Sequence, residues 1–245
     1  MREDLLAERL VSAVKSQPMF RGLSPDDQRR IVGLASLREH RRGEALWQEG
    51  DPAENLTLIV RGRVKIVRHA EAGDVILEIF GEGEPAGAIA AYNGMPYPAS
   101  AVCMESTVVL LLPRRDYFEL LDRNPLLARA IIRELTRITL ALTRKLEEMR
   151  GQRVETRIAQ LFLTLARRMG RETPEGIEIP LQLSRQEVAE MVGTTTESAI
   201  RVLSRWGREG LLVTGEKRFL LPSRDRLRVV AEGGPAEDEP GALPC

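Results

Sequence analysis

The spacing of apolar residues changes along the chain, and each change predicts a different kind of structure. Near the amino terminus, apolar residues recur every four positions and predict an amphipathic helix over residues 4–16. A second helix is predicted to begin after Ser24, because Pro25 suits the first helical position. From about Leu37 the period becomes two, and short stretches are separated by glycine-centred turns, which is typical of a small antiparallel roll or barrel.

A long helix is predicted next, because helical periodicity returns at Asn124-Pro125 and continues to about Arg150. Its apolar residues recur at alternating four- and three-residue steps, a heptad seam longer than a small domain needs for its own core. We expect the seam to pair with the same helix of a second copy, forming a homodimer. The alternative is that it packs against the chain's own roll. The seam residues are Ile131, Leu135, Ile138, Leu142 and Met149.

Two short helices joined at a glycine are predicted between Leu183 and Trp206. Ser184 and Glu187 form a capping box that starts the first helix. Gly193 ends it, because glycine adopts the positive φ that a tight turn between helices needs. The pattern is that of a helix-turn-helix. In its second helix, the residues expected to face inward are Ala199, Val202, Leu203 and Trp206.

The outward face of the second helix suits the reading of DNA bases. Glu197 can accept a hydrogen bond from the amine of cytosine, and Arg201 can bind both acceptors of guanine. The two residues lie four apart and therefore on one side of a helix. The alternative is an exposed ion pair without a function. We expect Thr196 and Ser198 beside them at the base edges, and the candidates for phosphate contacts are Arg185, Thr195 and Lys217.

The remaining carboxyl-terminal sequence predicts the wing of such a domain. Residues 157–168 read as a helix and Glu178–Leu183 as an edge strand. Two short strands are expected between Gly210 and Leu221, about a turn at Gly215, with Lys217 or Arg218 near a phosphate.

These patterns together predict an α+β fold. The expected parts are a β-roll sensor domain with amino-terminal helices over residues 1–124, a dimerisation helix over 125–150, a winged helix-turn-helix over 151–231 and a disordered acidic tail over 232–245.

Composition narrows the function. The 36 basic and 36 acidic residues balance, so DNA contact must come from a local basic patch. Cys103 and Cys245 form no disulfide framework or metal-ligand set, which fits a reducing cytoplasm. No apolar run approaches the length that spans a bilayer, and the charged start is no signal peptide. An enzyme is poorly supported, because His40 and His69 accompany no nucleophile motif and no phosphate-binding glycine motif joins a strand to a helix.

The order and spacing of several turn residues resemble the sensor domain of the Crp/Fnr (cyclic-AMP receptor and Fnr) superfamily. With the long helix and helix-turn-helix, the resemblance covers roughly residues 18–230. It implies a homodimeric transcription regulator that binds a palindromic duplex, contacts RNA polymerase and is controlled allosterically through its roll. The alternative is a cyclic-nucleotide-binding module that acts through protein partners alone and would not need the face of Glu197 and Arg201. The residues that carry the resemblance in the roll are Gly43, Gly50, Asp51, Leu58, Gly62, Val64 and Gly87.

The resemblance also places the effector pocket and disfavours cyclic AMP. In relatives that bind this nucleotide, a glutamate holds the ribose, an arginine neutralises the phosphate, and a threonine and a serine reach the adenine. The matching positions here are Ala88, Pro98 or Ala99, Leu142 and Thr143, of which only Thr143 keeps a hydroxyl. A phosphate buried without its arginine loses several kcal/mol, although Arg63 could in principle replace it. The predicted pocket comprises Gly87, Ala88, Ile89, Pro98, Ala99, Ser100, Leu142 and Thr143.

Haem is an open alternative for the effector. The loop over residues 86–101 is small and apolar, as expected of a hydrophobic pocket in relatives that bind haem and respond to nitric oxide or carbon monoxide. An iron–sulfur cluster is disfavoured, because the required group of cysteines is missing. A solvated histidine or a core sulfur is the ordinary alternative for each candidate, so we assign no metal site. The conceivable iron ligands are His40, His69, Met95, Cys103 and Met104.

Overall fold

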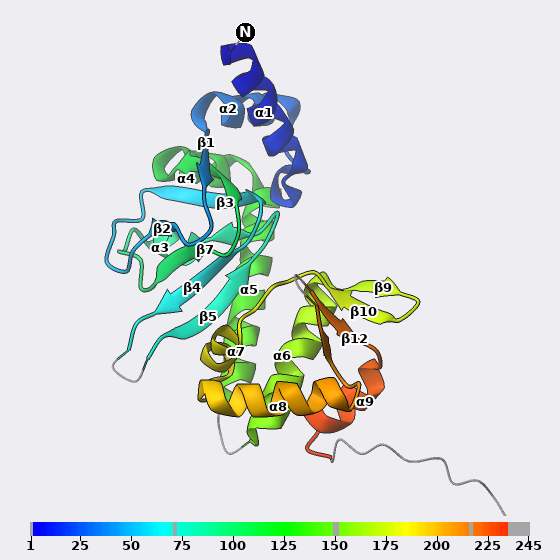
Figure 1. Ribbon diagram of the computed structural model, residues 1–245. Coiled ribbons are helices and arrows are strands. Elements are labelled where there is room, and N and C mark those ends of the chain that lie inside the picture. The colour runs from blue at the N-terminus through cyan, green and yellow to red at the C-terminus, as the bar shows by residue number, and fades with distance from the viewer. Residues whose placement is uncertain (1, 71–72, 149–151, 216–217, 235–245) are drawn as a thin grey trace, which may run out of the picture. The chain divides into compact units, whose positions relative to one another are not determined.

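The computed structural model shows the α+β fold that the sequence predicts (Figure 1). It describes residues 2–70, 73–148, 152–215 and 218–234. The chain forms two compact units, residues 1–142 and 143–245. The boundary falls inside the long helix α5, Pro125–Glu148. Met149, assigned to the dimer seam, and residues 235–245 of the expected tail lie outside the described residues.

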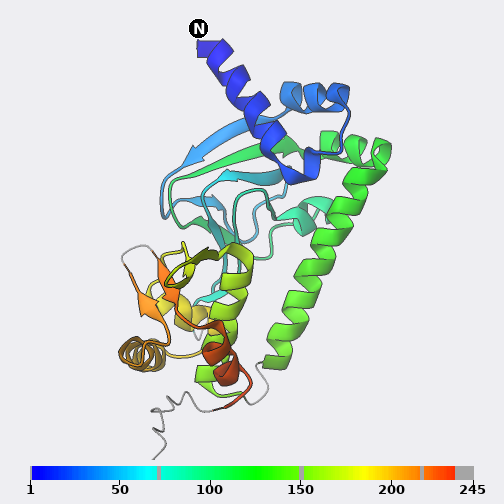
Figure 2. The same ribbon diagram turned by 90° about the vertical axis from the view of Figure 1, so that its right-hand side faces the viewer.

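The amino-terminal helices follow the predicted pattern. Helix α1 spans Arg2–Ser16, a short 3-10 helix spans Pro18–Phe20, and α2 spans Pro25–Leu34. The hydroxyl of Ser24 accepts a hydrogen bond from the backbone amide of Asp27 at 3.1 Å, which satisfies a free donor at the start of α2. Both helices lie at one end of the roll (Figures 1 and 2).

The predicted roll consists of two four-stranded sheets whose strand pairs are antiparallel. One sheet has the order β1-β8-β3-β6 and the other β2-β7-β4-β5. The strands are β1 (Ser36–His40), β2 (Ala45–Trp47), β3 (Asn55–Arg61), β4 (Val64–Arg68), β5 (Val75–Phe80), β6 (Pro85–Ala86), β7 (Ser100–Cys103) and β8 (Thr107–Pro113).

The central strand β3 is buried on both faces, because helices cover the side that points away from the second sheet. Leu56 and Leu58 face those helices and pair across the ladder with Leu112 and Leu110 of β8. Ile59 points the other way, into the core between the two sheets. The two cores together hold unit 1 and fix the loop after β6 against the roll.

Two helices in this unit were not predicted. Helix α3 (Ala88–Asn93) follows β6, and α4 (Arg114–Arg123) follows β8 and leads at Asn124 into α5. The helix α3 buries three alanines, and α4 buries Tyr117 and Leu120. The loop expected to line a hydrophobic pocket is therefore partly a helix that fills the core.

Helix α5 packs much of the predicted dimer seam against its own roll (Figure 2). Ile131 is only 4% exposed, and Leu135 is packed against the same core. Ile138 packs against the core between the sheets. These three residues thus follow the alternative packing. The side chain of Leu142 lies outside the described part of the chain.

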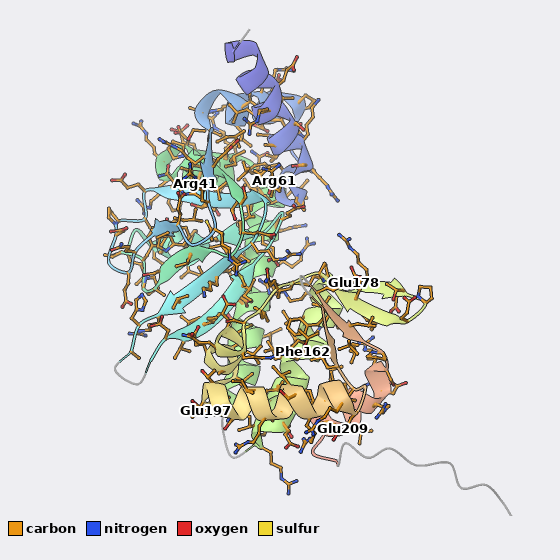
Figure 3. All side chains as sticks on the ribbon, in the orientation of Figure 1. Arg41, Arg61, Phe162, Glu178, Glu197 and Glu209 are labelled. Atoms are coloured by element: carbon orange, nitrogen blue, oxygen red, sulfur yellow. The ribbon has the colours of Figure 1, made fainter. Side chains whose placement is uncertain are left out.

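The second unit contains α6 and the predicted helix-turn-helix and wing. Its sheet has the order β11-β12-β10-β9, so β10 is an inner strand, and the expectation of an edge strand there was wrong. The charged β9, which shows no apolar alternation, covers that edge. Phe162 of α6, labelled in Figure 3, lies 4.8 Å from the Phe219 ring centroid in the core. The elements are α6 (Val154–Met169), β9 (Arg171–Thr173), β10 (Gly176–Ile179), α7 (Arg185–Val192), α8 (Thr196–Arg208), β11 (Val213–Thr214), β12 (Phe219–Leu221) and α9 (Arg224–Ala231).

Candidate nucleic-acid interface and effector pocket

The predicted capping box and turn of the helix-turn-helix are confirmed. At the start of α7, Glu187 and Ser184 exchange two hydrogen bonds, of 2.9 and 3.0 Å. Gly193 follows α7 with φ 65° and ψ 54°, the left-handed conformation that favours glycine. Arg157 of α6 donates to the carbonyls of Val192 and Gly193 at 2.7 and 3.1 Å. This anchor, which the sequence did not reveal, fixes the turn between the helices to the rest of the unit.

Burial of one side of α8 fixes which side faces solvent. All four apolar residues predicted to face inward are buried, and Trp206 is fully so. The hydroxyl of Thr195 accepts from the amide of Ser198 at 3.2 Å and caps the first turn. The cap gives this end of α8 a fixed direction, as a helix that enters a groove requires.

Glu197 and Arg201 lie on the exposed side of α8, and Figure 3 shows Glu197 near its amino-terminal end. Hydrogen bonds from its own amide and from Thr195 hold the pKa of Glu197 below its usual value, so its carboxylate is ionised at neutral pH. Arg201 donates to the hydroxyl of Ser198 at 3.1 Å. Within the described residues Glu197 and Arg201 form no ion pair with each other. Both therefore keep the polar groups that base edges would engage.

Ile200 is a further surface residue of α8 that the sequence reading missed. The residue is 45% exposed, and it lies three positions after Glu197 and one before Arg201 in the sequence of α8. The sequence carries one sign of this exposure: Ile200 is a large apolar residue one position outside the buried stripe of α8. Apolar side chains on a DNA-facing helix can contact the methyl group of thymine.

The phosphate candidates have different surroundings. Arg185 is half-buried and donates to the Thr214 hydroxyl of β11 at 3.1 Å, which links α7 to the wing. Burial lowers the pKa of its guanidinium. Arg218 is ion-paired with Glu178 of β10, labelled in Figure 3, so it is not an unoccupied cation at the wing tip. Lys217 lies outside the described residues.

The residues of the predicted effector pocket differ in their exposure to solvent. Ala88, Ala99 and Ser100 are buried, whereas Ile89 and Pro98 are exposed. The hydroxyl of Ser100 accepts a hydrogen bond from the amide of Glu49 at 3.0 Å and is thereby tied to the roll. Thr143 is exposed, and it belongs to the second unit.

An aromatic pair fills the space beside Gly87. The rings of Trp47 and Tyr97 stack with centroids 4.1 Å apart and planes at 14°. Trp47 Nε1 donates to the carbonyl of Ala99 at 3.0 Å. A Cβ at Gly87 would lie 2.6 Å from the Tyr97 ring and 3.0 Å from Trp47. The interior of the roll is therefore closely packed at the position where a glycine was expected to border a ligand.

Among the described residues, no fully buried side chain of the unit that contains the roll carries a charge. Its buried polar side chains are all neutral: Gln17, Thr57, Ser100 and Thr107. Burial raises the pKa of the Tyr97 phenol, which hydrogen-bonds to Thr57. Arg63, the substitute considered for the missing arginine, is ion-paired with Glu105 at 2.9 Å.

The conceivable iron ligands are held in separate surroundings. His40 lies 3.6 Å from a carboxylate oxygen of Glu44, and His69 lies 2.6 Å from one of Asp74. Cys103 is buried between the sheets, and burial raises the pKa of its thiol. In the described part of the chain, no three histidine, cysteine or acidic residues gather as a metal site. Nor does any helix there have the length and apolarity to cross a membrane.

Comparison with known proteins supports the assignment of both units. Residues 37–124 match the family of cyclic nucleotide-binding domains, and residues 156–230 match the Crp-like helix-turn-helix domain. The chain is 29% identical to the cyclic AMP receptor protein of Thermus thermophilus over 203 residues, which are 82% of this chain and 91% of that protein. It is 28% identical to the global nitrogen regulator of Synechococcus elongatus, over 75% of this chain and 84% of that protein.

The fold is similar to that of two solved structures. The structure of FixK2 from Bradyrhizobium japonicum superposes with a TM-score of 0.70 at 22% identity, covering 79% of this chain and 96% of that one. The transcriptional regulator TTHB099 from Thermus thermophilus superposes with a TM-score of 0.65 at 25% identity, covering 80% and 97%.

Proposed function

Since this chain belongs to the Crp/Fnr superfamily of DNA-binding transcription regulators, we propose that it binds a palindromic duplex as a homodimer under control of its roll. The exposed pair Glu197 and Arg201 on α8 carries the proposal, because an acceptor and a bidentate donor one turn apart can read adjacent base pairs. Thr196 and Ser198 flank them, and Arg185 and Thr195 are placed to contact the backbone. RNA polymerase is the protein partner that family resemblance implies.

The exposed side of α5 is the better candidate for the dimer seam. Ile132 and Leu140 are 61% and 53% exposed, and they lie two turns apart. Between them, the hydroxyls of Thr136 and Thr139 donate to carbonyls of the preceding turn, at 2.8 and 2.9 Å. Such bonding within the helix leaves the threonine methyl groups for contact. We therefore propose that the dimer seam comprises Ile132, Thr136, Thr139 and Leu140.

Helix α5 also suggests how a signal reaches DNA. It begins in the unit that contains the roll and continues across residue 142 into the second unit. A change in the roll that alters how two α5 helices pair would alter the separation of the two α8 helices. Selection from a pool of random duplexes tests the proposal. A two-fold symmetric consensus supports it, and recovery of no sequence contradicts it.

Ile200 adds a prediction about thymine. If its side chain contacts a thymine methyl, replacing the nearest thymine of the selected site by uracil should weaken binding severalfold, because it removes that contact alone. The variant Ile200→Ala should bind the two duplexes equally. Titration by fluorescence anisotropy measures both affinities. An unchanged preference for thymine in Ile200→Ala would rule out this contact.

Cyclic AMP is not the proposed effector. The Trp47–Tyr97 stack fills the roll beside Gly87, and among the described residues no fully buried side chain of the roll carries a positive charge. Calorimetric titration should therefore detect no binding tighter than about 1 mM, and the nucleotide should leave DNA affinity unchanged. Micromolar binding would contradict this proposal. Haem is the alternative effector, and a Soret band in the absorption spectrum of the purified protein would establish it.

A further inference from the structure

The surface of the roll contains an open cavity apart from the predicted effector pocket, and most of its lining residues are exposed. Its volume is about 390 Å³, within the range of sites that hold small organic ligands. None of the eight residues of the predicted effector pocket lines it, but Gly94, Met95 and Pro96 belong to the loop over residues 86–101 that was expected to line a hydrophobic pocket. Its lining residues are Pro52, Ala53, Glu54, Gly94, Met95, Pro96 and Arg114.

Arg114 gives this cavity a fixed positive charge. Its Nε donates to the carbonyl of Ala91 at 2.7 Å, and its guanidinium stands 4.9 Å from the ring centroid of Phe118. A Cβ at Gly94 would lie 2.6 Å from its Nη2, so the group also packs closely against the end of α3. Within the described residues Arg114 has no ion-pair partner. Glu54 lines the same cavity, and its carbonyl accepts a hydrogen bond from the Arg114 amide at 2.8 Å, but its carboxylate forms no ion pair with Arg114. An oriented guanidinium that no carboxylate engages suits a carboxylate ligand.

The other walls limit the kind of anion. Pro52 and Pro96 form a bridge between two segments of the roll, and Met95 is 43% exposed beside them. These side chains offer apolar surface to the body of a ligand. Glu54 adds one negative charge to the lining, so the site has a single net cation to offset and would repel a ligand with more than one negative charge.

We propose that this cavity binds a small organic monocarboxylate, with its carboxylate on Arg114 and its apolar body against Pro52, Met95 and Pro96. Arg114 is the first residue of α4, and α4 leads directly into α5. Occupancy would therefore bear on the helix that joins the two units. Binding of the monocarboxylate to this cavity does not depend on DNA recognition. A role of that ligand as the regulatory signal rests on the proposed function.

A fluorine NMR titration of the full-length protein tests this site, with 4-fluorophenylacetate as the probe. The wild type should broaden the probe signal, and the neutral 4-fluorophenylacetamide should bind at least about tenfold more weakly, because it lacks the charge that Arg114 engages. Arg114→Met should weaken probe binding by a similar factor. Arg115→Met is the matched control and should leave it unchanged, because the Arg115 side chain is 90% exposed and does not line the cavity.

Met95→Glu is a second variant, which should leave the fold intact because Met95 is 43% exposed. It should also abolish probe binding, because it adds a negative charge to the lining. The proposal is overturned if the wild type does not bind the probe, if the amide binds equally well, or if inorganic phosphate or succinate competes more strongly than the probe itself. Equal affinity of the Arg114→Met and Arg115→Met variants for 4-fluorophenylacetate also overturns the proposal. DNA affinity measured without ligand reports separately on the proposed function.

Discussion

Replacing Arg201 by alanine is expected to weaken binding to the selected duplex by about 1–3 kcal/mol and to relax the choice of base at its guanine. The reason is that a bidentate arginine contact discriminates through hydrogen bonds that other bases cannot offer. Arg201 is exposed, so its removal should leave the unit folded. Anisotropy titrations against duplexes altered at that one position measure both effects.

Arg171→Ala is the matched control for Arg201→Ala. It removes the same charge from an exposed position of the same unit, on strand β9 away from α8. The loss of DNA affinity in Arg171→Ala should be small and equal for all duplexes, because a distant surface charge contributes only sequence-independent attraction to DNA. Full base discrimination by Arg201→Ala would refute the assigned role.

Introducing glutamate at Ile132 should convert the protein to a monomer and reduce its affinity for the palindrome by orders of magnitude. In a symmetric helix pair the substitution places two like charges near each other in an apolar seam. A monomer binds only one half-site at a time, so it loses the gain in affinity that comes from linking two DNA-binding units. Sedimentation velocity gives the oligomeric state, and anisotropy gives the affinity.

Substitution of the neighbouring residue Ile131 should instead affect stability. Ile131 is buried against the roll, so Ile131→Ala should lower the free energy of unfolding by about 2–5 kcal/mol. Ile132→Glu should change it little, because Ile132 is exposed in the single chain. A dimeric Ile132→Glu variant, or one that binds the palindrome like the wild type, would contradict the proposed seam.

The helix-turn-helix could be predicted closely because its signals are local. The capping box of Ser184 and Glu187 and the turn at Gly193 act over a few residues, and the structure shows each of them as expected. The anchor from Arg157 could not be predicted, since it joins segments about 35 residues apart. Ile200 could not be assigned from the sequence, because an apolar residue next to the buried stripe of a helix is ordinarily part of the core.

Periodicity alone could not show which face of α5 forms the dimer seam. Ile131 and Ile132 are adjacent, and each begins a row of apolar or small residues that repeats along the helix. Either row can supply a seam, and only the packing of the roll decides which one is already covered. The same limit applies to the effector pocket. The Trp47–Tyr97 stack joins residues 50 positions apart, and Arg114 reaches its cavity from a helix that the pattern did not predict.

The most direct measurement is the mass of the complex formed with the selected duplex at physiological salt, together with its affinity relative to a scrambled duplex. Sedimentation equilibrium gives the number of chains bound, and competition by the scrambled duplex gives the specificity. We predict two chains on each two-fold symmetric duplex and a preference of at least about a thousandfold over the scrambled sequence. One chain per duplex, or equal affinity for both sequences, would contradict recognition by a pair of α8 helices.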